Sequence, residues 1–190
     1  MKRVGELLAL LVLGCSFNTV PRYSVEDTVG NPDLVFNGSF EVGIPQKTAL
    51  PPHWYVYDQP EGVVQWQQTD GHDQPRCLHI LHPDKPVDIV SDAFLVSTHD
   101  VYLLRAFVRT DGTGNAPVTV RFWGFNSAGK KINKFTEKFV PDTQWKEVSV
   151  TAGFLKPNAM FGRVIITIPA GKEDYWLDDV TCNQVYKFKK

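Results

Sequence analysis

The sequence predicts an all-β protein built as a two-sheet antiparallel β-sandwich. Apolar and polar residues alternate in many short segments, which is the pattern of half-buried strands. No segment after the first fifteen residues repeats apolar positions at helical spacing over three turns. Turn-forming clusters such as Ser127–Lys130 separate the alternating segments at short intervals. Short strands joined by such turns are typical of a sandwich with one core.

The first fourteen residues have the pattern of a lipoprotein signal peptide. Lys2 and Arg3 give a positive start, and the apolar run Leu7–Leu13 follows. The run is too short to cross a bilayer, which takes roughly 20 apolar residues. The end of the run with Gly14 and Cys15 resembles the bacterial lipobox, which predicts a lipid on Cys15. An ordinary secretory signal with an incidental cysteine is the alternative.

The segment after the cysteine predicts a tether and a location. Residues 15–30 are polar, include Pro21 and show no periodicity, so we expect a flexible tether ahead of one domain at 31–190. Ser16 stands where the sorting pattern of two-membrane bacteria, which this stretch resembles, would use aspartate to retain an inner-membrane lipoprotein. We therefore expect a lipid-anchored protein of the cell envelope, in the outer membrane if the source has two membranes.

The composition predicts a folded domain and limits the classes of partner that it can bind. Hydrophobic residues make up 43% of the 190-residue chain, which is enough for a folded core. The net charge of −1 provides no basic face for nucleic acid. Besides Cys15 there are two cysteines, Cys77 and Cys182. They could form one disulfide in an exported protein, or pack as two separate buried thiols, and the sequence leaves both open.

Ten segments have the composition and alternation of strands. Pro83 and Pro86 break the chain before the fifth of them. The predicted strands are 34–36, 54–57, 63–67, 77–81, 87–96, 102–110, 118–125, 145–150, 163–168 and 175–185.

Three of these strands have two different faces. Successive side chains point to opposite sides of a sheet, so Tyr102, Leu104, Ala106 and Val108 share one apolar face. The opposite faces of segments 102–110, 118–125 and 163–168 mix arginine, threonine and aromatic groups. These second faces are too apolar for an idle solvated surface and too charged for core, which indicates a binding surface.

The ordered set of motifs resembles a known family. The chain is similar to carbohydrate-binding modules of the cellulose- and xylan-binding type, within the galactose-binding-like jelly-roll superfamily. The resemblance covers Leu34 to Val185 and implies a jelly-roll sandwich that binds carbohydrate without catalysis. The matching motifs are LVFNGSFEVG at 34–43, Pro52 with Trp54, Tyr102–Thr110, Val118–Lys130, Trp145–Val148 and Leu177–Val180.

The resemblance also implies a structural calcium ion between the first and last strands. Glu41 matches one ligand, and Asp178 or Asp179 matches the other. Calcium prefers carboxylate and carbonyl oxygens. Adjacent strand residues face opposite ways, so we expect only one aspartate to reach the ion, with Asp178 favoured. The alternative is that the carboxylates accept backbone hydrogen bonds and hold no ion.

Two candidate ligand sites follow. A concave sheet face would carry Trp123 with Arg105, Arg121, Arg109 and Arg163, and several guanidinium groups would suit an acidic glycan. A loop-tip site would draw on Trp54, Tyr55, Tyr57 and Trp66, with Trp54 expected to be structural. The alternative for the sheet face is a covered surface whose arginines pair with neighbouring acids.

No catalytic motif emerges. There is no Gly-x-Ser-x-Gly elbow, and His79 and His82 are spaced to lie on opposite faces of a strand, which opposes a shared zinc site. The sequence therefore predicts a lipid-anchored, non-catalytic carbohydrate-binding protein. The alternatives are a structural or adaptor lipoprotein that contacts another envelope protein, and a small glycan-active hydrolase.

Overall fold

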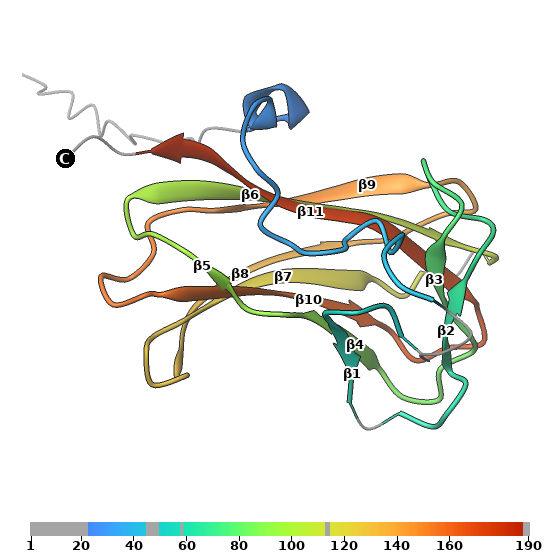
Figure 1. Ribbon diagram of the computed structural model, residues 1–190. Helices are drawn as coiled ribbons and strands as arrows, with labels where there is room; N and C mark the ends of the chain where they lie inside the picture. Colours follow the sequence, from blue (N-terminus) through green and yellow to red (C-terminus); the bar gives the residue numbers. More distant parts are fainter. Residues whose placement is uncertain (1–22, 45–49, 58, 113–114, 188–190) are drawn as a thin grey trace, which may run out of the picture.

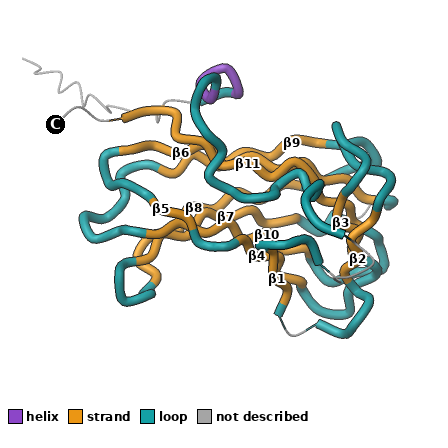
Figure 2. Tube along the Cα trace, in the orientation of Figure 1, coloured by secondary structure: helices purple, strands orange, loops and turns teal. Residues whose placement is uncertain are grey.

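The computed structural model describes residues 23–44, 50–57, 59–112 and 115–187. Two antiparallel sheets pack face to face, with long connections at both ends (Figures 1 and 2). In chain order the elements are the 3-10 helix η1 (Val25–Thr28), β1 (Trp54–Val56), β2 (Val64–Gln67), β3 (Cys77–Ile80), β4 (Val87–Ser91), β5 (Phe94–Leu95), β6 (Asp100–Thr110), β7 (Val118–Phe125), β8 (Lys131–Phe139), β9 (Lys146–Ala152), β10 (Phe161–Ile168) and β11 (Tyr175–Lys187).

The strands divide between a six-stranded and a five-stranded sheet. The six-stranded sheet has the order β1-β4-β10-β7-β8, with β5 also paired to β10. The five-stranded sheet has the order β2-β3-β11-β6-β9. Every pair is antiparallel, and consecutive strands such as β6 and β7 belong to different sheets. The predicted all-β jelly-roll sandwich is confirmed.

The core lies between the two sheets. Leu104 and Tyr102 of β6 point inward from the five-stranded sheet, and Phe122 of β7 points inward from the six-stranded sheet. The rings of Tyr102 and Phe122 stack across the core with centroids 5.7 Å apart. Because these inner residues alternate with the arginines, the arginines lie on the outer faces.

The segment 34–43 differs from its prediction. Residues 34–36 form no strand, and a single bridge between Asp33 and Asn183 ties this region to β11. Asn37 and Phe40 adopt left-handed backbone conformations, with φ of 55° and 58°. The carbonyl of Asn37 accepts a hydrogen bond from the Trp54 indole at 3.0 Å. The segment is therefore a tight loop that seals one end of the core.

Three other predictions change. The strand β8 was not predicted because its outer positions are mostly charged and its alternation is weak. The predicted strand 87–96 splits into β4 and β5. Residues 25–28, expected within a flexible tether, form η1 in contact with β11. Cys77 and Cys182 are two buried free thiols, so no disulfide joins them.

The predicted signal peptide and Cys15 lie outside the described residues. Within the described part of the chain, no helix is long and apolar enough to span a membrane.

Gly38 generates a stability prediction. A Cβ atom added there would lie 1.7 Å from the carbonyl oxygen of Val180, and the Val180 N–H donates to the Gly38 carbonyl at 2.9 Å. Gly38→Ala must therefore push the loop off β11, and we expect a loss of about 2 kcal/mol or more in the free energy of unfolding, measured with urea. Gly153→Ala is the control, since its methyl would meet only Val101 side-chain atoms, the nearest at 3.3 Å. Equal losses of stability in the two variants would contradict the close contact between Gly38 and Val180.

Candidate functional site

The structure separates the arginines that were expected to line one trough. Arg105 and Arg109 lie on β6 of the five-stranded sheet, whereas Arg121 and Trp123 lie on β7 of the six-stranded sheet. The sheets pack through their inner faces, so these residues lie on opposite outer surfaces of the molecule. The prediction of one shared trough is therefore wrong. Alternation predicts which face of a strand is polar, but not which sheet the strand joins.

On the five-stranded outer face the flat groups contact one another. Arg105 makes a bidentate ion pair with Glu147, with Nε–Oε1 and Nη2–Oε2 distances of 2.9 and 2.7 Å. The Arg109 guanidinium lies 4.1 Å from the ring centroid of Trp176. The His79 ring stacks on the same indole at 4.4 Å. For Arg105 the alternative of an arginine paired to an acid is therefore what the structure has.

A loop covers part of the same face. Residues 68–76, between β2 and β3, form this segment, called the 68–76 loop below. The imidazole of His72 stacks on Phe107 with centroids 3.8 Å apart. The backbone N–H of His72 donates a hydrogen bond to Asp178 Oδ2 at 2.7 Å. The loop therefore lies over β6 and β11 and reduces the open area of this face.

The six-stranded outer face carries a row of complementary groups. Arg163 of β10 is the cross-strand neighbour of Trp123 of β7. Asp92, which follows β4, interacts electrostatically with Arg163. Among the described residues Arg163 has no ion pair within 4.0 Å. These three residues, called the Asp92–Arg163–Trp123 row below, place a carboxylate, a guanidinium without an ion pair and an indole side by side.

A pocket adjoins this row. It has a volume of about 370 Å³ and is lined by Ala93, Phe125, Gly129, Phe161 and Arg163. The Trp123 ring packs edge-to-face against Phe125 at 6.3 Å, and Lys131 Nζ lies 3.7 Å from the indole centroid. The indole Nε1 of Trp123 is buried and has no hydrogen-bond partner among the described residues. The site thus combines aromatic surface with two cations, Arg163 and Lys131.

Tyrosines extend the row toward β1. The Tyr55 hydroxyl donates to Asp92 at 2.8 Å, and His53 Nδ1 lies 2.6 Å from the other Asp92 oxygen. Burial alone would raise the pKa of Asp92, but these two hydrogen bonds, together with the charges of His53 and Arg163, outweigh it and the pKa is lowered. Tyr57 stacks beside Tyr55 at 6.4 Å, and their exposed fractions are 56% and 40%. Tyr57 therefore reaches the surface as its predicted role requires.

The other predicted aromatic and arginine residues are less available. Trp66 is 7% exposed, packs in the core and donates its Nε1–H to the Phe40 carbonyl, so its expected place at a loop tip is corrected. Trp54 is core, as predicted. Arg121 lies on the six-stranded outer face but donates to Thr167 and pairs with Asp88 at 3.7 Å.

Around Glu41, Arg76 supplies the positive charge that the family resemblance assigns to calcium. The backbone N–H of Arg76 donates a hydrogen bond to Glu41 Oε1 at 2.8 Å, and the side-chain Nε of Arg76 lies 3.6 Å from Glu41 Oε2. The Arg76 guanidinium also donates to the carbonyls of Glu41 and Gly43. Arg76 therefore ties the 34–43 loop to the end of the 68–76 loop.

The two aspartates behave differently from the prediction. The pairing of β11 with β6 shifts register between Asp178 and Thr181, and Asp179 has a φ of 45°. Asp178 consequently contacts the backbone N–H of His72, and Asp179 contacts the ring nitrogen Nδ1 of the same residue. The two carboxylates therefore point to the same side of β11, and the prediction that only one of them does so is wrong. Asp178 is 0% exposed, and burial, joined by the charges of Asp179 and Glu41, raises its pKa to about 8.

These contacts do not fit calcium between Glu41 and Asp178. Calcium takes six to eight oxygen ligands. The Glu41 carboxylate and carbonyl already accept from Arg76, and each Asp178 oxygen accepts one backbone N–H. Calcium binding at Glu41 stays a prediction that the contacts of Arg76 oppose.

A histidine pair was also misplaced by the sequence. His79 Nε2 and His82 Nδ1 contact the two oxygens of Asp174 at 2.9 and 2.8 Å. The strand β3 ends at Ile80 and His82 has a φ of 34°, so strand alternation no longer applies. The prediction that the two histidines lie on opposite faces is wrong, and Asp174 links them.

The contacts of Arg76 generate a second prediction. Arg76→Gln removes an ion pair and leaves the Glu41 and Gly43 carbonyls without their donor, which should cost about 1–3 kcal/mol in the free energy of unfolding. Urea unfolding measures this loss, with the exposed Lys138→Gln as the control. We further expect added CaCl2 to leave the midpoint of the unmodified protein unchanged. A rise in that midpoint would show that Arg76 does not replace the ion.

No protein-family model matches this chain, and no curated protein matches it. Solved structures do match. A family 16 carbohydrate-binding module is 16% identical over 79% of this chain and 99% of its own, with a TM-score of 0.59. The module TmCBM61, solved with β-1,4-galactotriose, is 14% identical over 80% and 99%, with a TM-score of 0.54.

An enzyme also shares the architecture. The Stig cyclase Fisc from Fischerella sp. TAU is 11% identical over 84% of this chain and 100% of its own, with a TM-score of 0.61. Identities this low establish the fold alone. The chain therefore has the jelly-roll β-sandwich fold that these carbohydrate-binding modules have, as the sequence resemblance implied.

Proposed function

We propose that this protein binds carbohydrate, without catalysis, on the outer face of its six-stranded sheet. The observation that carries the proposal is the Asp92–Arg163–Trp123 row beside an open pocket. Aromatic side chains contact the apolar C–H faces of sugars, while planar charged groups hydrogen-bond the hydroxyls. Arg163 and Trp123 stand on neighbouring strands of one sheet, and Asp92 directly follows the next strand, β4, which limits the ordering cost of binding.

The shape of the surface supports an extended ligand. Phe125 and Phe161 line the pocket at one end of the row. Tyr55 and Tyr57 stand at the other end, on and after β1, with parallel exposed rings. An oligosaccharide lying across the strands would contact aromatic groups at both ends and Arg163 in between. A single sugar would use only part of this surface.

The charge of the surface supports an acidic glycan. Trp123 pairs across strands with Lys134, and Lys131 lies over its ring. Lys138, Arg121 and Arg163 belong to the same outer face, and Asp88 and Asp92 are its acids among the described residues. Guanidinium and ammonium groups in excess over carboxylates attract uronate or sulfate groups.

The expected lipid anchor belongs to the same proposal. A lipid on Cys15 would hold the sandwich at the cell envelope, and the outer membrane is the proposed location. In that position the six-stranded face would retain glycan near the cell surface. The likeness to carbohydrate-binding modules supports this function, but the shared fold of the cyclase means that the residues of the site must decide it.

Substitutions on the two outer faces test the location of the site. Trp123→Ala and Arg163→Gln should each weaken retention in affinity electrophoresis on a bound polysaccharide by about tenfold or more, which is about 1.4 kcal/mol. Arg105→Gln on the opposite face is the matched control and should retain binding. If Arg105→Gln abolishes retention while Trp123→Ala does not, the site lies on the five-stranded face instead.

The class of sugar is tested by charge and salt. We expect binding to a uronate-containing or sulfated polysaccharide, and weaker binding to a neutral polysaccharide of the same linkage. Raising NaCl from about 0.05 M to about 0.5 M should weaken the first interaction much more than the second, because screening acts on charge pairs. Equal affinity for both polymers at low salt would contradict an acidic preference and leave the location of the site intact.

A further inference from the structure

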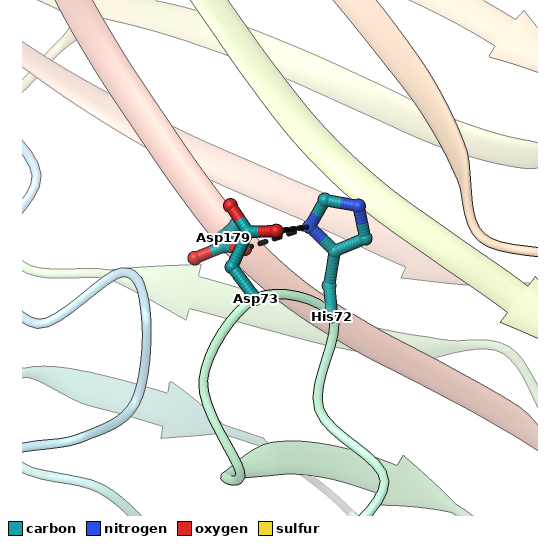
Figure 3. Close-up of side chains that lie close together, drawn as sticks. All are labelled: His72, Asp73 and Asp179. Carbon is teal, nitrogen blue, oxygen red and sulfur yellow. Dashed lines mark hydrogen bonds and ion pairs between the residues drawn. The ribbon is translucent and has the colours of Figure 1, made fainter.

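A second cluster lies on the opposite side of the sandwich from the proposed glycan surface. His72 and Asp73 come from the 68–76 loop, and Asp179 comes from β11 (Figure 3). One ligand atom from each of the three residues lies within 4.8 Å of the others. We propose that His72, Asp73 and Asp179 bind a divalent transition-metal ion such as Zn²⁺.

The distances between the ligand atoms match those around a small ion. His72 Nδ1 lies 2.9 Å from Asp179 Oδ2 and 3.4 Å from Asp73 Oδ1. Ligands bonded to zinc at about 2.0–2.2 Å are separated from one another by about 2.8–3.1 Å in octahedral geometry and about 3.3–3.6 Å in tetrahedral geometry. One ring nitrogen carries at most one proton, so a hydrogen bond serves only one of the two carboxylates. An ion among the three atoms would serve all of them.

One of the three ligands, His72, is held in place by its surroundings. The His72 ring stacks on Phe107 at 3.8 Å and meets Trp145 edge-on at 5.8 Å. The buried carboxylate of Asp178 accepts a hydrogen bond from the backbone N–H of His72, which holds the 68–76 loop against β11. Such contacts beyond the ligands orient metal-binding histidines and raise their affinity. The site would need little reorganisation to accept an ion.

The charge of the cluster itself favours a cation. Among the described residues, neither Asp73 nor Asp179 has an arginine or lysine within 4.0 Å, and each contacts the His72 ring instead. Arg105, which interacts electrostatically with Asp179, is already paired with Glu147. Two neighbouring carboxylates without a strong cation repel each other, and a bound ion would neutralise both.

The donor set selects the class of metal. One imidazole nitrogen and two carboxylates suit zinc, manganese or nickel, whereas calcium takes oxygen ligands in larger number. The side chains of His72 and Asp179 are 22% and 19% exposed, and Asp73 is 75% exposed, so an ion can enter from solvent. Bound there, it would fasten the 68–76 loop to β11.

Calorimetric titration of ZnCl2 into the full chain, freed of metal with a chelator, tests the proposal. We expect one Zn²⁺ per chain and no comparable heat from CaCl2. Asp73→Asn and His72→Gln should each weaken zinc binding by about tenfold or more. Asp73→Asn is informative because its side chain is mostly exposed, so the fold does not depend on it.

The control is Asp84→Asn, an exposed acid between β3 and β4, which should bind zinc like the unmodified protein. At the same zinc concentration, zinc should also raise the thermal midpoint of the unmodified protein and of Asp84→Asn by more than that of Asp73→Asn. Absence of zinc binding, equal binding by Asp73→Asn and the unmodified protein, or tighter binding of calcium would each overturn the proposal. None of these results depends on glycan binding, which is measured on the other face.

Discussion

The packing of two sheets through their apolar inner faces is the constraint on which the rest of the structure depends. Tyr102 and Phe122 stack across the interface, and each alternates along its strand with outward polar residues. Every arginine on β6, β7 and β10 must therefore lie on one of two opposite surfaces. Once β6 joins one sheet and β7 the other, no single ligand can contact Arg105 and Trp123 together.

The two surfaces use the same residue types in different ways. On the five-stranded face Arg105 is paired with Glu147, and His79, Trp176 and Arg109 form one stack, although Arg109 Nε and Trp176 Nε1 have no hydrogen-bond partner among the described residues. On the six-stranded face Arg163 has neither an ion pair nor a stacked ring among the described residues, and it borders a pocket. A ligand gains most where polar groups are placed but not already paired, because no internal interaction must be broken first. This difference, more than the fold, distinguishes a binding surface from a packed one.

Much of the fold could be predicted from the sequence, and the reasons for the errors are local. Alternation identified the core faces of β6, β7 and β10, because period-two burial depends only on neighbouring residues. It failed at Asp178 and Asp179, where a bulge turns both side chains to one side, and at His82, which follows the strand end. The assignment of strands to sheets depends on long-range pairing, which no local pattern records. Arg163, Asp92 and Tyr55 come together only through that pairing.

The 68–76 loop shows how the charge balance of one site depends on a single side chain. At its Arg76 end the loop brings its own cation to Glu41, so the carboxylate expected to hold an ion is already neutralised. At its His72 end the loop faces Asp178 and Asp179, and no arginine or lysine pairs with either carboxylate among the described residues. The proposed metal ion would therefore lie a few residues away from the position that the motif implies. The histidine at that position changes the class of ion that fits, because its nitrogen replaces one of the oxygens that calcium would use.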